Sequence, residues 1–194
     1  SAVASAWPLA AQEGNIRIGQ STHLSGPLAA TTVVTLKGQD LAFDEVNRAG
    51  GIAGRPVKLI KLDDMYDPQR CVENARRLIN EHKVIALFGM ANTAGIGATL
   101  PLLAPSRVPL IGVYSGSPAL RAQHHPYFFT TGASFRDEVV QMVRNLVTLQ
   151  QARLGLVFQD NAFGQLMLPV VEDVAKTYGA TIVAKHPLEV SGNN

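Results

Sequence analysis

The sequence predicts an α/β fold built on a doubly wound parallel sheet. Short apolar runs alternate with longer segments of helical periodicity, and turn residues separate them. Strands that alternate with helices in this way form βαβ units, whose strands run parallel. The 194 residues are 46% hydrophobic and 16% charged, a composition that supports a sizeable core and is not that of a disordered chain.

The first part of the chain contains four strand–helix units in succession. Gly50 and Gly51 end the first helix, and Asp67-Pro68 begins the second, because aspartate suits the N-cap and proline the first helical position. Continuous apolar runs predict that the third and fourth strands are buried on both faces of the sheet. The predicted strands span 15–21, 57–62, 84–88, 109–113 and 127–131, and the helices span 32–49, 68–82 and a segment ending near 105.

A second group of elements follows a break at 127–132. It comprises helices at 135–150 and 162–178 and strands at 154–158 and 181–186. One βαβ unit buries too little apolar surface to stand alone, so we interpret the break as a crossover into a second lobe that is unfinished in this chain. The predicted domains are a first lobe at 15–131 and the start of a second at 132–194. Residues 1–14, rich in small side chains, are predicted to be a signal-peptide remnant or a disordered tail.

Composition excludes several classes of protein. The net charge is +2 without a cluster of Lys and Arg, so we expect no nucleic-acid partner. No apolar run reaches the about 18 to 20 residues of a membrane helix, so the chain is not expected to span a membrane. A single cysteine, Cys71, excludes an intrachain disulfide and a thiolate metal cluster. We expect no metal and no cofactor.

Loops rich in Gly, Ser, Thr and Asn follow five of the predicted strands. Ligands of open parallel sheets bind beyond the carboxyl ends of the strands. Hydroxyls and free N–H groups at helix N-termini there suit a small anionic or zwitterionic ligand, although the same residues also make ordinary turns and caps. Asp63 and Asp64 could hold a cation or, alternatively, bond loop N–H groups. The five loops are 21–27, 63–67, 89–95, 114–118 and 159–164.

Enzyme motifs are weak by comparison. Gly95 and Gly97 begin a dinucleotide fingerprint, but Leu100 stands at the third glycine position. Ser115 lacks the flanking glycines of a nucleophile elbow, since Val113 and Ser117 occupy their positions. A hydrolase that uses Ser115 and a ligand-sensing regulator domain remain the alternatives to a binding protein without catalytic residues.

Several segments resemble the type I periplasmic solute-binding proteins of ABC importers, in their branched-chain amino-acid-binding branch. The resemblance rests on AFDEVNRAGGIAGRPVKLIKLDDMYDP at 42–68, LSGPLA at 24–29, ENARRLINEHKVIALFG at 73–89 and DNAFGQ at 160–165. It implies a Venus-flytrap clamshell of two lobes joined by three crossovers, with the second lobe incomplete in this chain. It also implies a periplasmic or otherwise extracytoplasmic location, a small-molecule ligand in the cleft and an ABC importer permease as partner.

The resemblance also implies roles for single residues. The family's ligand-binding hydroxyl falls on Thr93, its first-loop pocket residue on Thr31, and its aromatic lid on Phe163. Where branched-chain binders often carry a disulfide, this chain has Tyr66 and Asn92. The full set of predicted ligand-binding residues is Ser25, Thr31, Asn92, Thr93, Tyr114, Ser115, Gly116, Asp160 and Phe163.

The third and fourth loops predict a ligand with a carboxylate. Thr93 and the backbone N–H groups near Ala94, Ser115 and Gly116 would hold it, because helix N-termini leave unpaired donors with a partial positive charge. Neither loop contains Lys or Arg, which favours a carboxylate over a phosphate. A neutral amide or urea-like ligand is the alternative that the same donors allow.

Overall fold

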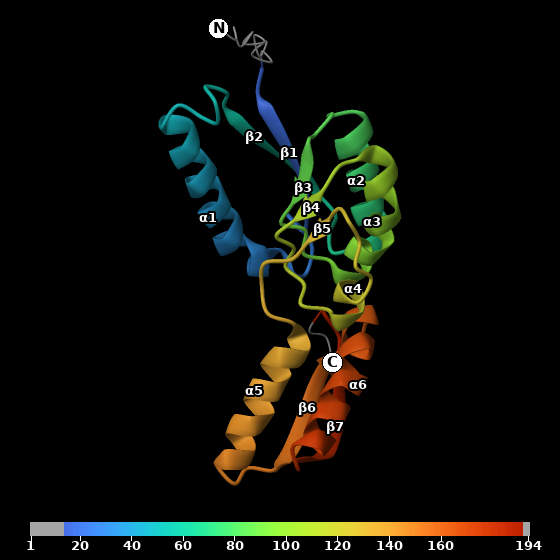
Figure 1. Ribbon diagram of the computed structural model, residues 1–194. Helices are drawn as coiled ribbons and strands as arrows, with labels where there is room; N and C mark the ends of the chain where they lie inside the picture. Colours follow the sequence, from blue (N-terminus) through green and yellow to red (C-terminus); the bar gives the residue numbers. More distant parts are fainter. Residues whose placement is uncertain (1–13, 192–194) are drawn as a thin grey trace, which may run out of the picture.

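The computed structural model describes residues 14–191 (Figure 1), so the predicted tail at 1–14 lies almost wholly outside the described residues. Helices and strands alternate through this part of the chain. The elements are, in order, β1 (Ile16–Thr22), α1 (Ala29–Arg48), β2 (Val57–Asp63), α2 (Pro68–Asn80), β3 (Ala86–Phe88), α3 (Thr93–Ser106), β4 (Leu110–Ile111), α4 (Pro118–Arg121), β5 (Phe128–Phe129), α5 (Phe135–Thr148), β6 (Arg153–Gln159), α6 (Ala162–Thr177) and β7 (Thr181–Leu188).

Two parallel sheets organise these elements, and they confirm the predicted fold class. The first has the strand order β2-β1-β3-β4-β5, with every neighbouring pair parallel. The second pairs β6 with β7, also in parallel. In Figure 1, α5, α6, β6 and β7 form a second body beyond the edge where the strands of the first sheet end. The sheets lie on either side of residue 131, and the division into domains there stays a prediction.

One face of the first sheet carries a complete core. Leu78 of α2, Leu87 of β3 and Ile96 of α3 are fully buried there. Asp67 caps α2 as predicted, with its side chain accepting the N–H of Arg70 at 2.8 Å. Cys71 is also fully buried, and burial raises the pKa of its thiol to about 12, so it acts as a small core residue.

The opposite face is covered less completely, and the prediction of strands buried on both faces is wrong. Ile85, just before β3, is 61% exposed, and Ile111 of β4 is 37% exposed. The reason is the position of α1, which lies across the sheet from α2 and α3 (Figure 1) and contacts it chiefly at β2. An apolar run therefore correctly predicted each strand but not what covers it.

The second body has a smaller core. Val139 and Val143 of α5 pack with Val174 and Ala175 of α6. Ser134 and Asp137 form a capping box that begins α5. None of the helices within residues 14–191 has the length and apolar character needed to cross a bilayer.

Candidate functional site

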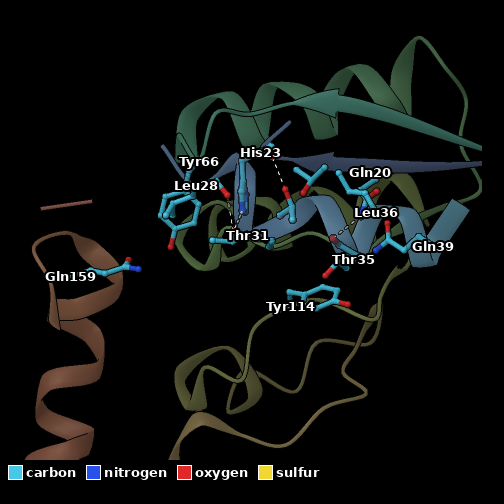
Figure 2. Close-up of a pocket in the computed structure, with 14 residues that line it drawn as sticks. Gln20, His23, Leu28, Thr31, Thr35, Leu36, Gln39, Tyr66, Tyr114 and Gln159 are labelled. Carbon is cyan, nitrogen blue, oxygen red and sulfur yellow. Dashed lines mark hydrogen bonds between the residues drawn. The ribbon is translucent and has the colours of Figure 1, made fainter. Parts of the chain in front are cut away.

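Two adjoining cavities lie between the sheet edge and the second body, and Tyr66 lines both. The first has a volume of about 320 Å³ and is called the Gln20 cavity. The second, of about 430 Å³, is called the Phe163 cavity. Gln159 reaches the first from the second body (Figure 2), and Phe163 forms part of the second. Both cavities therefore open between the loops of the first sheet and the second body.

The side chains of β1 alternate between the two faces of the sheet, and this alternation places polar side chains in the Gln20 cavity. Successive side chains of a strand point to opposite faces of the sheet. Gly19 faces α2, where an added Cβ would lie 3.0 Å from Leu78, and Ser21 bonds Asn74 of the same helix. Gln20 and Thr22 consequently point to the other side and line the cavity beneath α1.

The carboxylate of Asp63 accepts hydrogen bonds that hold the first loop in place. One carboxylate oxygen accepts the backbone N–H groups of Leu24, Ser25 and Met65, and the other accepts the Ser25 hydroxyl at 2.5 Å. Burial acts to raise the pKa of Asp63, but these hydrogen bonds outweigh it and hold the pKa below its ordinary value. Ser25 thus lies away from both cavity walls. Of the two interpretations of the acidic pair, Asp63 fits the loop-bonding one.

A buried pair of titratable groups lies at the wall of the Gln20 cavity, where His23 is a lining residue and Asp64 is its partner. His23 is 3% exposed, and its Nδ1 is 4.0 Å from Oδ1 of Asp64, too far for a hydrogen bond. Burial lowers the pKa of His23, against the opposing charges of Asp64 and Asp63. Burial likewise raises the pKa of Asp64, against hydrogen bonds from Tyr66 and Ser21. Both shifts disfavour the charged forms, and the two groups are too far apart for a hydrogen bond, so we do not describe the pair as a salt bridge.

Two of the predicted residues lie on opposite walls of the Gln20 cavity. Thr31, in the first turns of α1, donates its hydroxyl to the carbonyl of Leu28 at 2.7 Å. Tyr114 faces the cavity from the fourth loop and is 57% exposed (Figure 2). The edge of the His23 ring packs on Tyr66, with centroids 5.2 Å apart. The cavity therefore combines aromatic surface with hydroxyl and amide groups.

The side chain of Asn92 forms hydrogen bonds that hold the third loop in place. Its side-chain oxygen caps α3 by accepting the N–H of Gly95 at 2.9 Å. Its side-chain nitrogen donates to the carbonyl of Tyr66 at 2.7 Å. Both polar ends of the side chain are thus occupied by the protein, although Asn92 lines the Phe163 cavity.

The third and fourth loops meet through a pair of hydroxyls. Oγ1 of Thr93 and Oγ of Ser115 are 3.0 Å apart, and both residues are buried. Among residues 14–191, no hydrogen bond uses the backbone N–H groups of Ala94, Ser115 or Gly116. Gly116 lies so close to the second body that an added Cβ would be 2.6 Å from the nitrogen of Phe135.

The wall from the second body is less buried. Asn161 caps α6 by accepting the N–H groups of Phe163 and Gly164. The ring of Phe163 is half-buried and meets Phe135 edge to face, with centroids 5.5 Å apart. Asp160 is exposed, and its side chain lies on neither cavity wall.

The sequence did not single out five of the residues that line these cavities for ligand contact. Gln20 and Gln39 fall inside predicted regular elements, where polar residues are usually taken as solvent-facing. The signal in the sequence was a glutamine next to the end of a predicted strand, followed by a loop rich in hydroxyls. The five residues are Gln20, His23, Gln39, Tyr66 and Gln159.

The geometry gives the hydrolase alternative no support. The hydroxyl of Ser115 bonds Thr93 and the N–H of Ser117, and within the described residues it reaches neither an imidazole nor a carboxylate. His125 accepts the N–H of Tyr127 in a turn. In this same part of the chain, no three His, Cys, Asp or Glu side chains are grouped to hold a metal ion.

Known proteins resemble this chain in sequence and fold. The profile of the family described as "Periplasmic binding protein" matches residues 15–194. The Leu/Ile/Val-binding protein homolog 8 of Brucella abortus is 27% identical over 180 residues, which cover 88% of this chain and 44% of that protein.

Solved structures give the same result. A substrate-binding periplasmic protein from Ralstonia solanacearum is 30% identical, with a TM-score of 0.83 over 90% of this chain and 50% of that one. An extracellular ligand-binding receptor from Verminephrobacter eiseniae is 27% identical, with a TM-score of 0.80 over 91% and 50%. The chain spans about half the length of these relatives. It belongs to the periplasmic binding protein family, in the type I branch that includes the leucine/isoleucine/valine-binding proteins.

Proposed function

We propose that this chain is part of an extracytoplasmic receptor that captures a small carboxylate-bearing molecule between two lobes and delivers it to the permease of an ABC importer. The observation that carries the proposal is a set of unpaired donors on the third and fourth loops. The N–H groups of Ala94, Ser115 and Gly116 lack acceptors within the described residues and lie next to the Thr93–Ser115 hydroxyl pair. A carboxylate satisfies several such donors at once.

The charges around these donors favour a carboxylate. Neither loop contains Lys or Arg, so the negative charge would be met by the N-terminus of α3 and by N–H dipoles. Tyr114 and Phe163 offer flat apolar surfaces from the two sides. These surfaces suit a ligand with an aromatic or bulky aliphatic body, and the activity that we propose is binding without catalysis.

The relatives' names are compatible with this ligand class. The Brucella protein is named as a Leu/Ile/Val-binding protein homolog, and such amino acids carry a carboxylate. We propose the acid group and leave the body of the ligand open, so that it includes an amino acid or an organic or aromatic acid.

Removal of the Thr93 hydroxyl tests the proposal. Native mass spectrometry of the purified protein would identify a ligand retained from the host, and calorimetry would then compare that acid with its primary amide. Thr93→Val keeps the shape of the side chain and should weaken acid binding by about 1.5 to 3 kcal/mol, tenfold or more. Equal affinity for the acid and the amide would refute the carboxylate assignment in favour of a neutral ligand.

Thr99 supplies a matched control for that substitution. It lies on the same helix, is fully buried, and donates its hydroxyl to the carbonyl of Gly95 at 2.8 Å. It lines neither cavity. Thr99→Val removes the same group from the same helix and should leave the affinity unchanged, so a loss of affinity in both variants would indicate a general disturbance of α3.

A further inference from the structure

The side-chain oxygen of Gln20 is buried and accepts no hydrogen bond within the described residues. The residue is 1% exposed and lies at the carboxyl end of β1, where it lines the Gln20 cavity. Its Nε2 donates to the carbonyl of Gly89 at 2.9 Å, which fixes the orientation of the amide. Oε1 therefore faces away from Gly89, and it accepts no hydrogen bond within the described residues.

Gln39 brings a second amide to the same place from α1. A Cβ added to Gly89 would lie 2.6 Å from Nε2 of Gln20 and 2.9 Å from Nε2 of Gln39, so both amide heads converge over this glycine. Gly89 also has a positive φ of 61°, which favours glycine independently. The side-chain oxygen of Gln39 is buried and has no donor among residues 14–191 (Figure 2).

Two buried acceptors without donors are costly. Leaving a buried acceptor unsatisfied loses the free energy of its hydrogen bonds to water, and the hydroxyl of Thr31, which also lines the cavity, is already donated to Leu28. A ligand group that brings two hydrogens would satisfy both oxygens. Among the described residues the cavity lining includes no Asp or Glu, so uncharged donors such as an amide or a hydroxyl suit these two oxygens.

We propose that the Gln20–Gln39 end of the cavity is a subsite for an uncharged donor group of the ligand, such as a primary amide or a hydroxyl. The inference rests on the proposed function, because it concerns the other end of the same ligand. Ala91 and Tyr114 line the cavity and belong to the third and fourth loops, which carry the free N–H groups. One molecule can thus present a carboxylate to the loops and an amide or hydroxyl to the glutamines.

Matched pairs of acids test this subsite. L-glutamine is compared with L-methionine, and 4-hydroxybenzoate with 4-methylbenzoate, by thermal shift and calorimetry on the purified chain. In at least one pair the donor-bearing member should bind about tenfold more tightly or better. Gln20→Leu and Gln39→Leu should each abolish that preference without weakening the methyl or thioether analogue, whereas Gln141→Leu, on the exposed side of α5, should preserve it.

Each outcome separates this inference from the proposed function. Equal affinity within both pairs, no binding by either donor-bearing member, or a preference that survives both glutamine substitutions would overturn the subsite. If instead the acids bind no better than their primary amides, the carboxylate proposal fails while the donor preference stands. Gln39 lies on a partly exposed helix, so Gln39→Leu remains informative if Gln20→Leu does not fold.

Discussion

The two walls of the cleft are built differently. The wall from the first sheet contains buried side chains that bond one another: Asn92 joins Gly95 to Tyr66, and Thr93 meets Ser115. The wall from the second body carries the half-buried Phe163 and is otherwise more exposed. One wall is fixed before a ligand arrives, and the other presents an aromatic surface that its neighbours constrain less.

The hydrophobic core beneath the first wall is also larger than the core beneath the second. Leu78, Leu87 and Ile96 are fully buried under the first wall, in a cluster that spans α2, α3 and the central strands. The cluster under the second wall is smaller and is made chiefly of valines such as Val139 and Val174. Local stability follows buried apolar contact. We therefore expect the first wall to set ligand specificity and the second to add cover.

Core truncations should show the largest difference. Leu87→Ala should reduce the free energy of unfolding by about 2 to 5 kcal/mol, because it leaves a cavity in the centre of the first sheet. Val174→Ala removes fewer buried carbons from the smaller core and should cost about 1 to 3 kcal/mol. Urea denaturation measures both, and an equal or larger cost for Val174→Ala would contradict the comparison.

Phe163 tests the role of the second wall. Phe163→Ala should weaken ligand binding by about 1 to 3 kcal/mol if the ring covers the ligand. The alternative is a purely structural contact with Phe135, in which case the melting temperature would fall and the affinity would persist. Calorimetry with the co-purified ligand distinguishes these outcomes. Phe129→Ala serves as a control, since Phe129 is exposed on β5 and lines neither cavity.

Local signals in the sequence predicted the fold better than the site. Asp67-Pro68 began a helix as predicted, because a cap depends on residues next to one another. The exposure of Ile85 depends instead on how far α1 extends over the sheet, which its own residues do not encode. Likewise Gln20 and Gln39 meet only because the fold brings strand and helix together over Gly89.

Removing the two asparagine helix caps compares how much each cap stabilises its wall. Asn92→Ala removes the cap of α3 and should cost about 0.5 to 2 kcal/mol of stability. It also leaves the carbonyl of Tyr66 without its donor. Asn161→Ala removes the equivalent cap of α6, and it should cost less because Asn161 is only half-buried. Thermal melts rank the pair, and the reverse order would show that the second wall is the more rigid one.

The smallest effect should appear in the pH dependence of stability. Burial lowers the pKa of His23 below 6.5 in the folded state, so just below pH 6.5 the unfolded chain binds more protons than the folded one. The free energy of unfolding should therefore decrease as the pH drops from 6.5 to the pKa of His23 in the folded state. Below that pKa, His23 causes no further decrease. Asp64 has the opposite effect, because burial raises its pKa above 3.8 in the folded state. As the pH falls from that raised pKa towards 3.8, the folded chain binds more protons than the unfolded one, and its stability rises on this account. Urea denaturation between pH 5 and 7.5 should show a flatter profile in His23→Phe than in the wild type. An unchanged slope in that variant would mean that the imidazole of the first wall is solvated after all.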